Sequence, residues 1–187
     1  MELMLRCAVP DRPGALAQLA SAISAAGGDI HSVDVVEHHG GRALDDLEII
    51  LDDDRVPTLL SEVVALDEVE VVHAGPSRGR TGDAVTRMSI ALTALLDGSA
   101  EVRRGMCTLI GGMLRARSAE FVAPAQVPDG DDPRILTLHA GDDVLVLRRD
   151  YRFTATERER AHALLALARR AIDVTAGDQS GVSSLSR

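Results

Sequence analysis

Residues 11–16, Asp-Arg-Pro-Gly-Ala-Leu, constrain the fold of this chain more than any other segment. They follow an apolar run at 3–9 and open an amphipathic segment that ends near residue 28. Asp11 belongs to the residue types that cap helix N-termini, and Pro13 suits a first helical turn, where its missing N–H costs no hydrogen bond. Gly14 permits the close approach of a ligand or of a second backbone. The run therefore predicts a strand, a tight turn and a helix whose open N-terminus can hold a small anion.

The periodicity of the next residues predicts the rest of a small domain. Apolar residues at helical spacing continue to Gly27 and Gly28, where the glycines end the helix. A strand at about 30–38 reverses at two further glycines and returns through alternating apolar residues to about residue 51. A second helix near 56–64 and a short strand at 69–73 complete the order βαββαβ. This is the order of the ferredoxin-like split βαβ arrangement, an antiparallel sheet with two helices on one face.

These features resemble the ACT domain, a regulatory module that commonly binds amino acids. The resemblance covers about residues 2–75. Residues 11–16 are similar to the D-x-P-G-x-L turn of that family, residues 28–30 are similar to its G-x-N-I strand entry, and the order of elements agrees. Asp29 departs from the pattern because Asn is frequent at that position. An ionised Asp only accepts hydrogen bonds, so it would repel a ligand carboxylate placed beside it.

The resemblance also implies a ligand site between neighbouring ACT domains. We expect the carboxylate of an amino acid to lie against the open amides near residues 12–15, where the helix dipole favours an anion. Its ammonium group would meet acceptors at the start of the second strand of a neighbouring domain, in a homodimer formed by exposed sheet edges. In the alternative interpretation, residues 11–14 only turn and cap the chain. The predicted ligand-binding residues are Asp11, Arg12, Pro13, Gly14, Ala15, Leu16, Asp29, Ile30, His31 and Ser32.

A second domain is predicted after a linker at residues 76–84, which lose apolar periodicity and gain turn-forming residues. The first domain then spans 1–75 and the second spans 85–172. The second shows two helical segments, near 88–95 and 102–113, and strands at about 119–123, 134–140 and 143–152. A final helix is predicted from Thr154 to about Ile172, with Thr154 and Glu157 spaced as a capping box. This order, ααβββα, is not a second βαββαβ unit.

Residues 143–172 resemble the end of a GAF domain, in which a strand, an F-T-x-x-E turn and a long helix close the fold. The resemblance implies a short GAF-like α/β domain with an antiparallel sheet and an abbreviated ligand pocket. The expected fold class of the whole chain is therefore α+β. Residues 173–187 are rich in Ser and Gly, and we predict that they are a disordered tail.

Charge and composition argue against several classes of partner. The chain of 187 residues has a formal net charge of −9, divided into −11 for residues 1–75 and +2 for the remainder. An acidic first half does not favour phosphate backbones, and 2 Phe with 1 Tyr offer no stacking surface for bases, so we predict no nucleic-acid partner. The sequence shows no signal peptide and no spanning apolar run, which predicts a cytoplasmic protein without a membrane partner. Its basic residues are all Arg and it contains no Asn, which indicates a high-GC bacterial genome.

No pattern of catalytic or metal-binding residues stands out. The sequence contains no nucleophile elbow, Walker loop or dinucleotide fingerprint. Adjacent His38 and His39 on a strand point to opposite faces and do not converge on a metal. For the same reason only one of Asp45 and Asp46 could enter a site. We therefore predict no catalytic residue, metal or cofactor.

The expected function is that of a non-catalytic regulator that binds an amino acid and acts on a partner enzyme. The alternative is a ligand-free assembly or protein-interaction module. A buried charged pair in the second domain would instead favour an enzyme.

Overall fold

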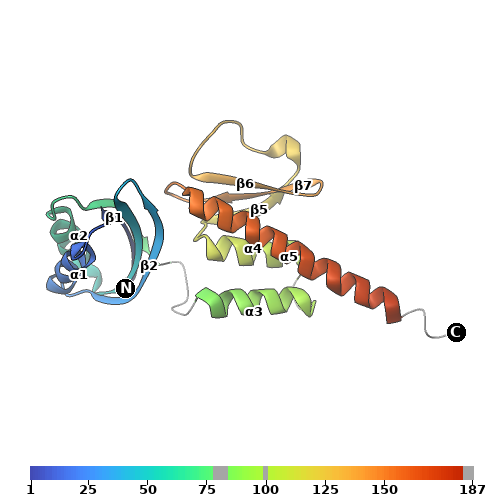
Figure 1. Ribbon diagram of the computed structural model, residues 1–187, viewed down its shortest axis with the longest axis horizontal. Coiled ribbons are helices and arrows are strands. Elements are labelled where there is room, and N and C mark those ends of the chain that lie inside the picture. The colour runs from blue at the N-terminus through green and yellow to red at the C-terminus, as the bar shows by residue number, and fades with distance from the viewer. Residues whose placement is uncertain (78–83, 99–100, 183–187) are drawn as a thin grey trace. The chain divides into compact units, whose positions relative to one another are not determined.

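The computed structural model describes residues 1–77, 84–98 and 101–182 of the chain. Its internal contacts divide it into two compact units, Met1–Arg78 and Gly79–Arg187, both drawn in Figure 1. The division falls inside residues 76–84, the segment predicted as the linker. Residues 76 and 77 belong structurally to the first unit, because strand β4 includes Pro76 and the amide of Ser77 donates to the Glu2 carbonyl oxygen (2.9 Å).

The N-terminal unit has the predicted order of elements. In chain order they are β1 (Glu2–Pro10), α1 (Ala15–Ala25), β2 (Asp29–His39), β3 (Arg42–Ile50), the short 3-10 helix η1 (Asp53–Arg55), α2 (Val56–Val64) and β4 (Glu70–Pro76). The strands form one sheet in the order β2-β3-β1-β4, and each neighbouring pair is antiparallel. Helices α1 and α2 lie on one face of this sheet (Figure 1). The ferredoxin-like α+β arrangement is therefore confirmed for this unit.

Alternate side chains of β1 and β3 pack beneath the two helices. Leu5 of β1 and Leu47 of β3 are completely buried, together with Leu19 of α1 and Leu59 of α2. The hairpin between β2 and β3 turns at two glycines with φ of 59° and 75°, the left-handed conformation that a two-residue hairpin turn requires. The β1–α1 turn lies at the same end of the sheet as this hairpin, because Pro10 at the end of β1 pairs with Arg42 at the start of β3.

The C-terminal unit also has its predicted order, ααβββα. Its elements are α3 (Ala84–Leu96), α4 (Val102–Met113), β5 (Ser118–Val122), the 3-10 helix η2 (Pro124–Gln126), β6 (Ile135–Ala140), β7 (Asp143–Arg148) and α5 (Ala155–Val182). The three strands form an antiparallel sheet in the order β5-β7-β6. Helix α4 contacts β5, α5 contacts β6, and α3 packs on both helices (Figure 1). The three α-helices and the three strands all contribute to one apolar core.

Two boundaries differ from the sequence-based prediction. Strand β7 ends at Arg148, although a strand was expected as far as residue 152. Both neighbouring strands begin their pairing at Arg148, so the next residues have no ladder partner. Helix α5 continues to Val182, ten residues beyond Ile172, where the final helix was expected to end. Adding a residue to an existing helix costs far less than nucleating one, and no proline interrupts this segment. Residues 183–187 of the predicted tail lie outside the described residues.

Candidate functional site

The turn between β1 and α1 forms one end of the N-terminal unit. Helix α1 begins at Ala15, and the residue before it, Gly14, has φ of 90° and ψ of −14°. This left-handed backbone favours glycine, so a side chain at position 14 would be strained although no atom lies within 4 Å of its Cβ position. The expectation that Asp11 caps the helix is wrong, because no side chain caps α1. The expectation that Pro13 lies in the first helical turn is also wrong, since the chain becomes helical only after Gly14.

The first turn of α1 presents open backbone amides to solvent. The amide of Ala15 donates to the Arg12 carbonyl oxygen at 3.3 Å, and the amide of Gln18 donates to the Gly14 carbonyl oxygen at 3.0 Å. Among the backbone hydrogen bonds of the described residues, none has the amide of Leu16 or Ala17 as its donor. Unpaired N–H groups at the positive end of a helix dipole attract anions. The open amides thus differ from the expected ones at residues 12–15, since the amides of Arg12 and Ala15 donate to the carbonyl oxygens of Pro10 and Arg12, and Pro13 has no N–H.

An exposed histidine–carboxylate contact and an exposed ion pair hold the turn against neighbouring segments. His38 Nδ1 lies 3.1 Å from Asp11 Oδ2, with 59% and 51% of the two side chains exposed. On the other side, Arg12 Nη2 lies 3.0 Å from Glu68 Oε2. Arg42, at the start of β3, donates from Nη2 to the Glu68 carbonyl oxygen at 2.9 Å. The β2–β3 hairpin and the α2–β4 loop thus position Asp11 and Arg12, which use their side chains away from the helix amides.

A buried carboxylate lies close to the same end of the sheet. Asp45 is opposite Cys7 in the register of β1 and β3, and only 2% of its surface is exposed. Its Oδ1 atom is buried without a hydrogen-bond partner. Burial raises the pKa of Asp45, the negative charges of Asp46 and Asp11 raise it further, and His38 lowers it. Burial, together with Asp45 and Asp46, raises the pKa of the Cys7 thiol to about 12. Cys7 is therefore a buried, protonated thiol.

The other half of the predicted site lies at the opposite end of the sheet. Asp29 is paired with Ile50, which is also paired with Glu2 at the beginning of β1. The length of β1 places this end about 25 Å from the β1–α1 turn. Here Asp29 and His31 are exposed, Ile30 packs partly against the core, and Ser32 donates from Oγ to Glu48 Oε2 at 3.2 Å. One domain does not bring the two predicted groups of residues together.

A groove of about 840 Å³ runs between α1 and the end of α2. Arg12 is the predicted site residue that lines it, at the end where this arginine meets Glu68. Much of the remaining lining consists of alanines and acidic side chains. Sequence reasoning missed this groove because it depends on the separation of two helices that are distant in the chain.

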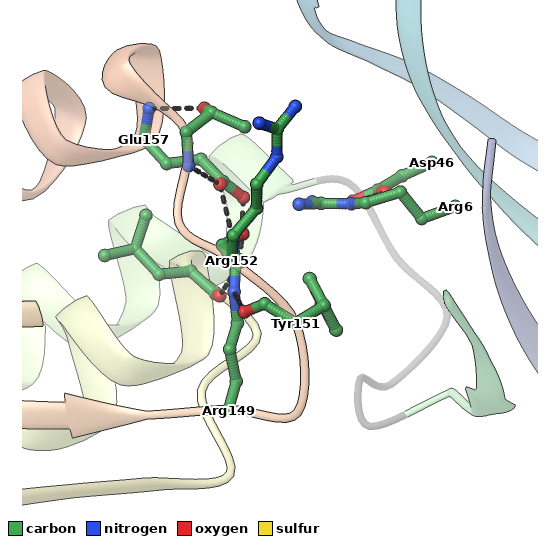
Figure 2. Close-up of polar contacts among 8 residues, drawn as sticks. Arg6, Asp46, Arg149, Tyr151, Arg152 and Glu157 are labelled. Carbon is green, nitrogen blue, oxygen red and sulfur yellow. Dashed lines mark hydrogen bonds and ion pairs between the residues drawn. The ribbon is translucent and has the colours of Figure 1, made fainter. Parts of the chain in front are cut away.

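The C-terminal unit contains a buried charged pair that the sequence pattern did not indicate. Arg149 and Glu157 are side by side in Figure 2, with 1% and 4% of their side chains exposed. Arg149 Nη1 donates to Glu157 Oε1 at 2.8 Å and to the Leu114 carbonyl oxygen at 2.9 Å. Its Nε donates to the Tyr151 carbonyl oxygen at 3.1 Å and its Nη2 to the Arg152 carbonyl oxygen at 2.5 Å.

Glu157 also forms the predicted capping box with Thr154, which is therefore confirmed. The amide of Thr154 donates to Glu157 Oε2 at 2.8 Å, and the amide of Glu157 donates to Thr154 Oγ1 at 3.1 Å. The Arg149 guanidinium carbon lies 4.2 Å from the ring centroid of Tyr151 and 3.9 Å from that of Phe153. Each nitrogen of Arg149 is therefore engaged, which suits an internal brace between β7 and α5 more than a group that meets a substrate.

The described residues show neither a metal site nor a membrane span. Within residues 1–77, 84–98 and 101–182, no three His, Cys, Asp or Glu side chains are placed to hold a metal ion. In the same part of the chain, no helix is long and apolar enough to cross a membrane.

Comparison with known proteins identifies the N-terminal unit. The family model of the ACT domain matches residues 3–68. No curated protein matches the chain. Among solved structures, the ligand-free regulatory subunit of aspartate kinase from Thermus thermophilus is similar, with 14% identity, 91% of each chain covered and a TM-score of 0.37. An unknown protein from Galdieria sulphuraria is similar at 13% identity over 90% of this chain and 91% of that chain, also with a TM-score of 0.37. Residues 3–68 of this chain, with the β1–α1 turn near their start, are therefore an ACT domain.

Proposed function

We propose that this protein is a non-catalytic regulatory protein whose ACT domain binds an amino acid at the β1–α1 turn. The observation that supports this most directly is the uncapped start of α1. Among the described residues, the amides of Leu16 and Ala17 donate to no backbone carbonyl oxygen. A ligand carboxylate placed there would satisfy both amides at the positive end of the helix dipole. ACT domains commonly bind small molecules, and this turn is the part of the domain that carries the family's motif.

The proposal includes a homodimer in which the ligand lies between two ACT domains. Strand β2 is at the edge of its sheet, and Val33 and Val35 on this strand are 38% and 49% exposed. Pairing this edge with a second copy would cover apolar surface and unpaired backbone groups. Residues 29–32 would then approach the β1–α1 turn of the other copy, which a single domain does not allow.

We assign no reaction to the C-terminal unit. The buried Arg149–Glu157 pair meets the condition under which an enzyme would be favoured, but the bonds of Arg149 to three backbone carbonyl oxygens leave its donors occupied. We propose that this unit is a short GAF-like domain that contacts a partner enzyme.

The test is a thermal-shift screen of the full chain against the twenty amino acids, followed by calorimetry. A ligand at 100 times its dissociation constant stabilises the native state by about 2.7 kcal/mol, which a thermal shift resolves. We expect one amino acid to stabilise the protein, and its carboxamide, which lacks the carboxylate, to bind at least tenfold more weakly. A flat panel combined with a stable oligomer would reject the sensor in favour of the assembly module. Equal binding of the carboxamide would reject the helix amides as the anion site.

A further inference from the structure

The proposed site has a clear place for the carboxylate of an amino acid, but the expected ammonium acceptors lie far from it. Asp29 is at the opposite end of the sheet within one domain, and its side chain is exposed. An acceptor in the same domain as the turn would let one copy recognise both charges of the ligand. The following inference rests on the proposed function and assigns that acceptor.

Asp45 has the position that such an acceptor needs. Residues 43 and 47, which flank it on the same face of β3, belong to the core beneath the helices, so Asp45 also faces the helix-covered side. Its partner Cys7 lies three residues before the end of β1, where the chain enters the turn. Asp45 therefore lies on the helix-covered face of the sheet, close to the end at which the chain enters the turn into α1. The adjacent Asp46 points to the other face, where its Oδ1 lies 2.6 Å from Arg6 Nε.

The carboxylate of Asp45 lacks the partner that a buried charge requires. Its Oδ1 atom is buried without a hydrogen bond, and 2% of the residue is exposed. A buried carboxylate that is neither protonated nor paired with a cation is strongly disfavoured. By contrast, the similarly buried Asp46 has Arg6 as its partner, with a second contact of 2.8 Å from Nη2 to Oδ2. The same strand thus holds one satisfied and one unsatisfied buried carboxylate.

The groups around Asp45 favour an added positive charge. Burial is the main cause of the raised pKa of Asp45, and the negative charges of Asp46 and Asp11 raise it further. Of the neighbouring charges, His38 has the largest effect and lowers this pKa, but its side chain is exposed and contacts Asp11. The Cys7 thiol opposite Asp45 stays protonated. An exposed pair of this kind is weak, so a ligand can displace His38 from Asp11 at small cost.

We infer that Asp45, with Asp11 beside it, accepts the ammonium group of an amino acid whose carboxylate lies on the amides of Leu16 and Ala17. The ligand class is a zwitterion that spans the start of α1 and the first residues of β3. Asp29, His31 and Ser32 of a second copy then contact the ligand's side chain instead of its ammonium group. Asp45 is a binding residue in this assignment.

The experiment compares ligands on the wild-type chain and then compares variants. The probes are the amino acid that gives the largest thermal shift in the twenty-member panel and its desamino analogue, the same acid without the α-amino group. The variants are Asp45→Asn, which keeps the shape of the side chain but removes its charge, and the control Asp54→Asn, an exposed residue of η1 that follows β3 at the end of the sheet away from the turn. Far-UV circular dichroism verifies the fold of both variants, and calorimetry gives the dissociation constants.

We expect the desamino analogue to bind wild type at least tenfold more weakly than the amino acid. We also expect Asp45→Asn to weaken amino-acid binding at least tenfold and Asp54→Asn to leave it unchanged within twofold. Amino-acid binding that survives Asp45→Asn, or falls as far in Asp54→Asn, overturns this assignment while the proposed function stands. If Asp45→Asn does not fold, equal binding of the two probes to wild type overturns it. A panel in which no amino acid binds overturns the proposed function and this assignment together.

Discussion

Replacing Arg149 by Met should strongly destabilise the C-terminal unit. The side chain of Met fills much of the space of the arginine stem but supplies neither a charge nor a donor. The substitution leaves the Glu157 carboxylate, 4% exposed, without its charged partner. It also removes donors from the carbonyl oxygens of Leu114 and Tyr151 and removes the cation above two aromatic rings.

The size of the effect follows from the burial of the pair. Removing one partner of a buried ion pair typically costs about 3–5 kcal/mol, because the remaining charge is left buried and uncompensated. The neighbouring Arg148 provides a matched control, since it pairs with Glu120 at the surface, where the two side chains are 35% and 54% exposed. Loss of an exposed pair costs up to about 1 kcal/mol, so Arg148→Met should have a small effect.

Urea unfolding followed by tyrosine fluorescence measures this difference in one unit. The chain has 1 Tyr and no Trp, and Tyr151 lies in the C-terminal unit beside Arg149. Far-UV circular dichroism reports on both units and identifies an independent transition of the ACT domain. The double variant Arg149→Met/Glu157→Gln removes both charges, and Gln still accepts a hydrogen bond from the Thr154 amide. It should be more stable than Arg149→Met alone.

Two results would refute this reasoning. If Arg149→Met costs no more free energy of unfolding than Arg148→Met, the buried pair does not brace the unit. If the double variant is less stable than Arg149→Met, the uncompensated carboxylate of Glu157 is not the source of the loss.

Two further predictions concern stability. Gly112→Ala in α4 should stabilise the C-terminal unit by about 0.5 kcal/mol, since Ala favours helices and no atom lies within 4 Å of the new Cβ. Gly111→Ala should destabilise the C-terminal unit, because the new Cβ would lie 2.9 Å from the Ala119 Cβ. Equal urea midpoints for Gly111→Ala and Gly112→Ala would contradict this packing argument. Burial raises the folded-state pKa of Asp45, so the native state binds the extra proton and stability falls as pH rises through that raised pKa. Asp45→Asn should therefore be more stable than wild type by about 1 kcal/mol at about pH 7 and should lose this advantage near pH 3. Urea unfolding at the two pH values measures the difference. An advantage that is equal at both would show that the titration of Asp45 is not its cause.

The sequence by itself determined the order of helices and strands in both units. Helical and strand periodicities, the glycine pair of the β2–β3 hairpin and the capping box of Thr154 and Glu157 are local signals, because each depends on residues close together in the chain. The same local signals indicated the ACT-like turn. They placed Asp11 at the helix cap, however, because the sequence does not show that Gly14 delays the helix or that His38 occupies the Asp11 carboxylate.

Only the tertiary structure decided which polar groups are buried and which have partners. The sequence predicts that Asp45 and Asp46 face opposite ways, but the register of β1 and β3 decides that Asp46 meets Arg6 while Asp45 faces the core. The register likewise places Asp29 at the opposite end of the sheet from the β1–α1 turn, so the grouping of the two in one site, which the family pattern implies, needs two neighbouring domains. These relationships join residues that are distant in the chain, and the free energy of a buried charge depends on neighbours that only folding supplies.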